Sequence, residues 1–136
     1  MRMKRLVALL VLPLVLAVTG CSLLGGSDWD EVKVSFDAST ASGDYTLVMT
    51  PAEATYTLDG KATTHELPTG VWTALTTGLK ALGDRTGEAC LDGQTILIEA
   101  SAAGEVKQAF EANSCDAGDA FTQAQSLIEQ VLSRLR

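Results

Sequence analysis

Three cysteines, Cys21, Cys90 and Cys115, are the residues of this 136-residue chain best suited to covalent chemistry. An odd number leaves one thiol over if the other two form a disulfide. Cys21 directly follows an apolar run, whereas Cys90 and Cys115 lie far downstream in polar sequence. The position of Cys21 therefore needs an explanation of its own.

The amino end has the three parts of a secretory signal. Residues 1–5 carry three basic side chains, and Leu6 to Val18 is an uncharged apolar run interrupted only by Pro13. A basic start, a short apolar segment and small residues at its end are typical of a cleaved signal peptide. A membrane-spanning helix needs roughly 20 apolar residues, so this run is too short to span.

The last four residues of this segment, Val18-Thr19-Gly20-Cys21, resemble the lipobox of bacterial lipoproteins. The resemblance implies cleavage before Cys21, a diacylglycerol on its sulfur and often a third acyl chain such as palmitate on the new amino terminus. Two acyl chains hold a protein stably at a bilayer. We therefore expect a signal peptide over residues 1–20 and an extracytoplasmic protein anchored to the cell membrane, or to the inner leaflet of the outer membrane in a two-membrane source.

A short tether links the lipidated cysteine to the folded part. Residues 21–30 contain "SLLGGS" and then the acidic "DWD". Trp29 stands just after the tether, where it either packs on the domain or rests at the membrane interface. The remaining residues, 31–136, are enough for one domain.

The composition of the mature chain excludes one class of partner. Cleavage before Cys21 leaves seven Lys and Arg against seventeen Asp and Glu, a net charge of −10. Such a domain repels nucleic acid and anionic head groups, so no nucleic-acid partner is expected.

Lipidation of Cys21 makes the number of free thiols even. Cys90 and Cys115 then form a pair in a compartment where disulfides persist. A zinc site is the rival interpretation, but two thiols without a nearby histidine make a poor ligand set. The sequence therefore predicts a Cys90–Cys115 disulfide and no metal or other cofactor.

No catalytic constellation is visible. His65 is the single histidine, and no Gly-x-Ser-x-Gly motif accompanies it. The acids have structural explanations: those near the tether are mobile, and the others mark turns or a helix start (Asp28, Asp30, Glu31; Asp59, Asp92; Asp116, Asp119). We expect the protein not to be an enzyme.

Hydrophobic periodicity predicts four strands and then a helix. Apolar and polar residues alternate over 32–36, 45–50 and 55–58, and Asp59-Gly60 is a hairpin turn leading into 62–67. From Pro68 to Leu82 the spacing changes to three and four residues, which indicates an amphipathic helix with Pro68 in its first turn and Gly83 as its cap.

The second half predicts a hairpin and a further helix. The hairpin is "QTILIEAS" and "EVKQAFEA"; the helix runs from a cap at Asp116 or Asp119 to Arg136. The fold class is α+β: an antiparallel sheet of five or six strands packed against two helices, in the order β-β-β-β-α-β-β-α. The expected core comprises Val34, Phe36, Leu47, Trp72, Leu75, Ile96, Ile98, Phe110 and the apolar stripe of the last helix.

Two predictions about the hairpin require different strand registers. A turn centred between Ala102 and Ala103 places Cys90 opposite Cys115. A shared face for Ile96, Ile98, Val106 and Phe110 needs a shift of one residue. We expect a β-bulge near Leu91-Asp92-Gly93 to reconcile the two.

These observations favour a membrane-anchored, non-catalytic binding or accessory module for a protein or cell-envelope polymer. The alternative is an inhibitor or modulator of an exported enzyme, with residues 38–44 as its exposed loop. A small carboxylate-dependent hydrolase is the third hypothesis. No motif in residues 31–136 assigns the mature domain to a characterised family.

Overall fold

The computed structural model describes residues 28–40, 43–88 and 90–136. The signal peptide, Cys21 and all but the end of the tether lie outside these residues. Within them the chain forms strands β1 (Glu31–Asp37), β2 (Tyr45–Met49), β3 (Glu53–Leu58), β4 (Lys61–Glu66), β5 (Thr95–Ala102) and β6 (Glu105–Asn113), and helices α1 (Val71–Leu82) and α2 (Ala120–Arg134).

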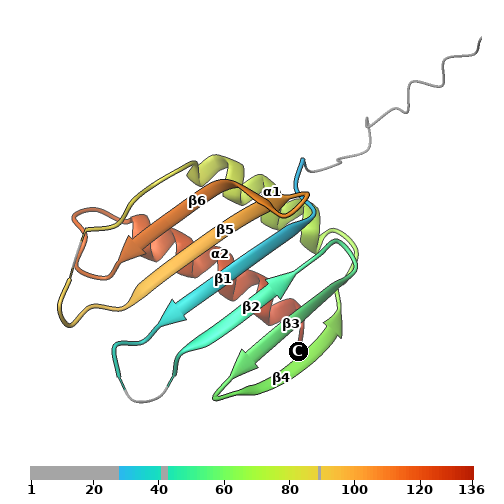
Figure 1. The fold of residues 1–136 in the computed structure, drawn as a ribbon, viewed down its shortest axis with the longest axis horizontal. Helices are drawn as coiled ribbons and strands as arrows, with labels where there is room; N and C mark the ends of the chain where they lie inside the picture. The colour runs from blue at the N-terminus through green and yellow to red at the C-terminus, as the bar shows by residue number, and fades with distance from the viewer. Residues whose placement is uncertain (1–27, 41–42, 89) are drawn as a thin grey trace, which may run out of the picture.

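The six strands make one antiparallel sheet in the order β4-β3-β2-β1-β5-β6. Helix α1 lies between β4 and β5 in the chain, and α2 follows β6. Both helices lie behind the sheet in Figure 1, so they cover one of its faces. The predicted α+β class, with a sheet packed against two helices, is confirmed.

Alternation along the strands separates a covered face from an open face. Val32 and Val34 of β1 are fully buried, and they pair with buried residues on β2 and β5. Most of the predicted core residues are buried; Phe36 is half-buried, and so are four residues of the last helix's apolar stripe, Phe121, Leu127, Leu132 and Leu135. Helix α2 adds Ala124, Ile128 and Val131 to this core.

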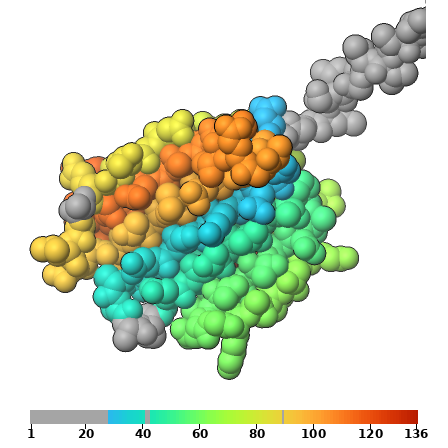
Figure 2. All heavy atoms as spheres, in the orientation of Figure 1, coloured from blue at the N-terminus to red at the C-terminus, as the bar shows by residue number. Residues whose placement is uncertain are grey.

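The open face is polar. Figure 2 looks onto this face, across which the strands run from β6 to β4. One row of paired positions crosses it from β4 to β6 through small, polar and apolar side chains: Ala62, Thr57, Thr46, Ser35, Leu97 and Glu111. An antiparallel sheet with one solvated face has this pattern.

Helix α1 begins later than its sequence pattern predicts. Pro68 precedes the helix instead of filling its first turn, because Gly70 has φ 86°, a left-handed conformation that stops the helix from extending backward. Gly83 ends the helix as predicted, with its N–H donating to the Leu79 carbonyl at 3.1 Å.

Helix α2 begins after Asp119, but no side-chain hydrogen bond caps it. Asp119 therefore occupies the N-cap position, as one of the two predicted candidates, but its carboxylate makes no capping hydrogen bond. Asp116 lies further upstream and binds other groups, and the helix ends at Arg134 instead of Arg136.

The bulge in the β5–β6 hairpin also lies elsewhere than predicted. The register shifts between Ala100 and Ser101, next to the turn, and Lys107 of β6 has no partner on β5. The shift keeps Ile96, Ile98 and Phe110 on the covered face but turns Val106 outward, to 49% exposure. The cysteines are not opposed in the ladder, because β5 begins after Cys90 and β6 ends before Cys115.

Candidate functional site

The loops gather at two opposite ends of the sheet (Figure 1). The described chain enters at one end, where the Asp30 N–H donates to the Ser101 carbonyl at 2.9 Å and its carboxylate accepts the Ala103 N–H at 2.9 Å. The other end, called the distal end here, comprises residues 38–40, 43–44, 59–60, 90–94 and 114–119. Any group presented there lies far from the point of entry.

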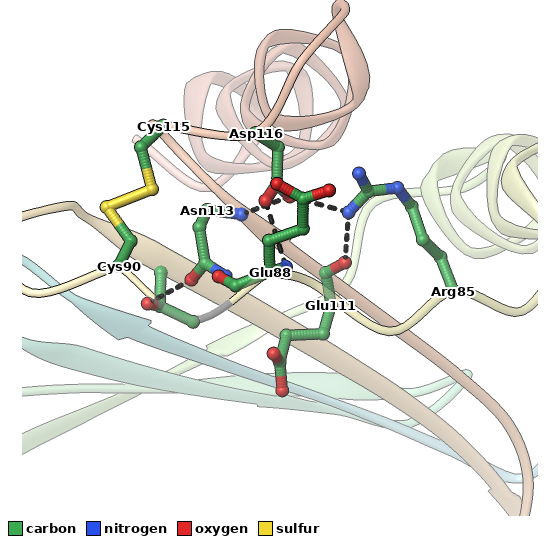
Figure 3. A network of polar contacts seen from close by, with 8 residues as sticks. Arg85, Glu88, Cys90, Glu111, Asn113, Cys115 and Asp116 are labelled. Carbon is green, nitrogen blue, oxygen red and sulfur yellow. Dashed lines mark hydrogen bonds and ion pairs between the residues drawn. A yellow bond between two sulfur atoms is a disulfide. The ribbon is translucent and has the colours of Figure 1, made fainter.

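A disulfide fastens the distal end. The sulfurs of Cys90 and Cys115 are 2.05 Å apart, and their Cα atoms 6.3 Å. As Figure 3 shows, the bond joins the α1–β5 connection to the β6–α2 connection. The predicted pairing is present in the structure, although both partners belong to connections instead of strands.

Asp116 ties the same two connections together. Its Oδ2 accepts hydrogen bonds from Arg85 Nη1 at 2.6 Å and from the Asn113 N–H at 2.8 Å, and its Oδ1 accepts the Glu88 N–H at 2.9 Å. The side chain is only 2% exposed. The Asn113 N–H, with Arg85 and the Glu88 N–H, holds the pKa of this carboxyl below its usual value, although burial opposes that shift.

At Arg85 the α1–β5 connection runs along the outer edge of β6. Its N–H donates to the Ala109 carbonyl at 3.0 Å, and its carbonyl accepts the Glu111 N–H at 2.8 Å, which forms a parallel bridge. Asn113 Nδ2 donates to the Glu88 carbonyl and so holds the next turn (Figure 3). The β6 edge is therefore covered, whereas every residue of β4 is exposed.

A hollow of about 520 Å³ lies on the open face toward the distal end. Its lining includes four acidic side chains and no Lys, Arg or His. The lining residues come from strands β1, β2, β3, β5 and β6 and from their distal loops: Ser35, Phe36, Asp37, Asp44, Tyr45, Thr46, Thr57, Asp59, Gly60, Thr95, Leu97 and Glu111.

The four acids of the hollow have no cationic partner among the described residues. The described residues form the ion pairs Lys80–Asp28, Arg85–Asp116 and Lys107–Glu105. None of these side chains lines the hollow. Asp37 and Asp44 each accept a backbone N–H at 2.8 Å, from Ser39 and Ala38. These bonds shape the loop but leave the negative charge of the hollow uncompensated.

Three of the other acids singled out in the sequence, Asp28, Asp30 and Asp116, have side-chain partners, whereas Asp59 belongs to the hollow and to a turn. Asp28 lies 3.5 Å from Lys80, Asp30 holds the β5–β6 turn, and Asp59 occupies the β3–β4 turn at φ 49°. In the described part of the chain, no three His, Cys, Asp or Glu side chains are arranged to hold a metal ion. His65 lies on β4, exposed, at the far edge from the disulfide.

Trp29 packs on the domain. Its side chain is 8% exposed and belongs to the core cluster, with Lys80 Nζ 5.6 Å from the ring centroid. The chain is therefore held to the fold from Trp29 onward, and the indole is not available to a membrane interface.

The sequence pattern placed Leu91 in a predicted β-bulge and indicated no functional role for it. It is fully exposed, at 102%, beside Cys90 on the disulfide-linked connection. Ser39 Oγ donates to the carbonyl of the next residue, Asp92, at 3.3 Å. The sequence signal for the exposure of Leu91 is an apolar residue between a predicted disulfide and an Asp-Gly turn. The predicted bulge does not form there, because β5 begins only at Thr95.

Comparison with protein-family models, curated proteins and solved structures finds no match for this chain. Neither α1 nor α2 is long and apolar enough to cross a bilayer, and no other helix lies in the described residues.

Proposed function

We propose that this protein is a lipid-anchored, non-catalytic binding module of the bacterial envelope, whose partner presents positive charge. The observation that carries the proposal is the acid-lined hollow at the distal end of the open sheet face. Four carboxylates without a cationic partner create a negative potential that a Lys- or Arg-bearing segment would neutralise.

The position of the expected lipid anchor supports a hollow that faces away from the membrane. Asp28 follows the lipobox cysteine by seven residues, so the described domain begins a short stretch of chain after the expected lipid attachment point. The end of the sheet near Asp30 would then lie close to the bilayer, and the distal end would face away from it. The net charge of −10 also repels anionic head groups and would keep the open face accessible.

Charge-matched variants test the binding surface. Asp59→Asn with Glu111→Gln removes two charges from the hollow, whereas Glu53→Gln with Glu66→Gln removes two from the opposite end of the open face. We expect the first pair to weaken binding of a lysine-rich peptide, and of the partner crosslinked in intact membranes, by roughly tenfold at low salt. Equal effects of both pairs would refute a localised site.

The anchor has a separate test. Cys21→Ser should abolish incorporation of labelled palmitate and leave an uncleaved or mislocalised precursor. If the variant is retained at the membrane as the native protein is, the lipoprotein assignment is wrong. This result does not depend on the outcome for the hollow.

Inhibition of an exported enzyme is the second candidate, and Leu91 favours it. A fully exposed leucine on a disulfide-fastened loop is suited to insertion into a partner's apolar pocket. In that case crosslinking captures one enzyme in stoichiometric amount, its activity falls, and Leu91→Ala restores the activity. If Leu91→Ala leaves capture unchanged while the hollow variants abolish it, the binding-module proposal is favoured.

A further inference from the structure

We infer that a pocket between β4 and the end of α2 binds a small organic carboxylate with an apolar body. The pocket has a volume of about 210 Å³ and is lined by Tyr56, His65, Leu132, Leu135 and Arg136. It lies on the covered side of the sheet, away from the acidic hollow, and is independent of the proposed function.

The topology brings these residues together. Tyr56 shares the covered face with Ala54, and Ala54 pairs with His65, so both polar side chains lie on the helix side of the exposed edge. Leu132, Leu135 and Arg136 follow at the end of α2, whose C-terminal end lies next to β3 in Figure 1. The pocket is therefore formed where the last residues of the chain meet the β3–β4 hairpin.

The polar groups of the pocket are suited to an anion. The Tyr56 hydroxyl, an imidazole N–H and the Arg136 guanidinium all donate hydrogen bonds, and a guanidinium matches a carboxylate with two parallel bonds. Within the described residues none of these three groups forms a side-chain hydrogen bond or an ion pair. Their donors remain available to a ligand.

The side chains that line the pocket also carry no negative charge. No Asp or Glu lines it, in a chain with seventeen acidic residues. Glu66 follows His65 but points to the open face with its partner Glu53. Glu129 lies one helical turn before Leu132 and acts on Tyr45, whose pKa burial raises to about 12, with Tyr56 and Glu129 adding to the rise.

Size and lining define the ligand class. Pockets for drug-sized molecules measure about 300–1,000 Å³, so 210 Å³ limits the ligand to a small molecule. Leu132, Leu135 and the ring of Tyr56 offer apolar contact to its body, and Arg136 would bind its head group. Benzoate and hexanoate have this size and polarity and serve as probes.

Titration of the lipid-free mature domain followed by NMR tests the inference. Benzoate should produce saturable shifts at the five lining residues with an affinity in the millimolar range. Arg136→Gln should weaken that affinity by at least roughly fivefold, because it removes the charged hydrogen bonds. Arg134→Gln makes the same charge change two residues away, on a side chain that lines a different pocket, and should leave the affinity unchanged.

Three outcomes would overturn the inference: shifts that do not saturate, equal binding of the neutral analogue benzamide, or equal weakening by Arg134→Gln. Both arginines are at the surface end of α2, so neither substitution removes a core contact. Unchanged spectra of the free variants away from the substituted residue would confirm that both remain folded.

Discussion

Arg85 and Asp116 are 31 residues apart in the sequence, yet Arg85 Nη1 lies 2.6 Å from Asp116 Oδ2. The Cys90–Cys115 disulfide crosses the same two connections, so an ion pair and a covalent bond hold one junction. This junction covers the edge of β6 and fixes the loop that carries Leu91. The rigidity of the distal end therefore depends on contacts between segments remote in sequence.

Replacement of Asp116 by Asn should lower the thermal midpoint of the domain at neutral pH. The midpoint of the variant should also change less than that of the native protein as the pH falls. The pKa of Asp116 is lower in the folded than in the unfolded protein. Its stabilising contribution is therefore complete above the unfolded value, about 3.9, and is lost as pH falls through the folded value. Thermal melts between pH 7 and pH 2 should show the native and variant midpoints converging in acid.

Asp119→Asn is the matched control for this prediction. Asp119 precedes α2 but makes no side-chain capping bond. Its substitution should leave the midpoint nearly unchanged at every pH. A constant difference between native protein and Asp116→Asn across the whole range would contradict the proposed role of the carboxylate charge.

Removal of the disulfide should cost about 3 kcal/mol of unfolding free energy, because the bond spans 25 residues of sequence and restricts the unfolded chain. Urea denaturation of Cys90→Ala with Cys115→Ala measures the loss. Reductant should destabilise the native domain and leave the double variant unaffected. Free thiol at either position in denatured, unreduced protein would disprove the bond.

Truncation of two adjacent residues of β5 should destabilise the domain by different amounts. Ile98 is 1% exposed on the covered face, so Ile98→Ala should destabilise the domain by about 2–5 kcal/mol. Leu97 is half-buried on the open face, and Leu97→Ala should cost roughly 1 kcal/mol or less. Similar losses from the two variants in chemical denaturation would mean that the sheet faces are assigned wrongly.

Ala103→Asn should stabilise the β5–β6 turn by about 0.5–1 kcal/mol. Ala103 has φ 51° and is followed by Gly104 at φ 76°, a pair of left-handed residues for which Asn-Gly is favoured. The N–H that donates to Asp30 is kept in the variant. Ala102→Asn, at a position outside the left-handed region, should bring no such gain in the same melts.

Local sequence patterns predicted most of the fold. Alternation over Val32, Val34 and their neighbours, the Asp59-Gly60 turn and the Gly83 cap each depend on a few adjacent residues. The parity of the cysteines predicted the disulfide once Cys21 had been assigned to lipid. These features could be read from the chain because propensity, turn chemistry and periodicity act over short distances.

The tertiary structure decided the remainder. The bulge lies at Ala100–Ser101 and not at the predicted position. Asp116 binds Arg85 instead of capping a helix, and Leu91 is exposed. The acidic hollow and the pocket near Arg136 likewise combine side chains from several strands or from a hairpin and a distant helix end. Local patterns specify which face of an element is apolar, but which polar groups meet depends on how the elements pack, and only the folded chain contains that information.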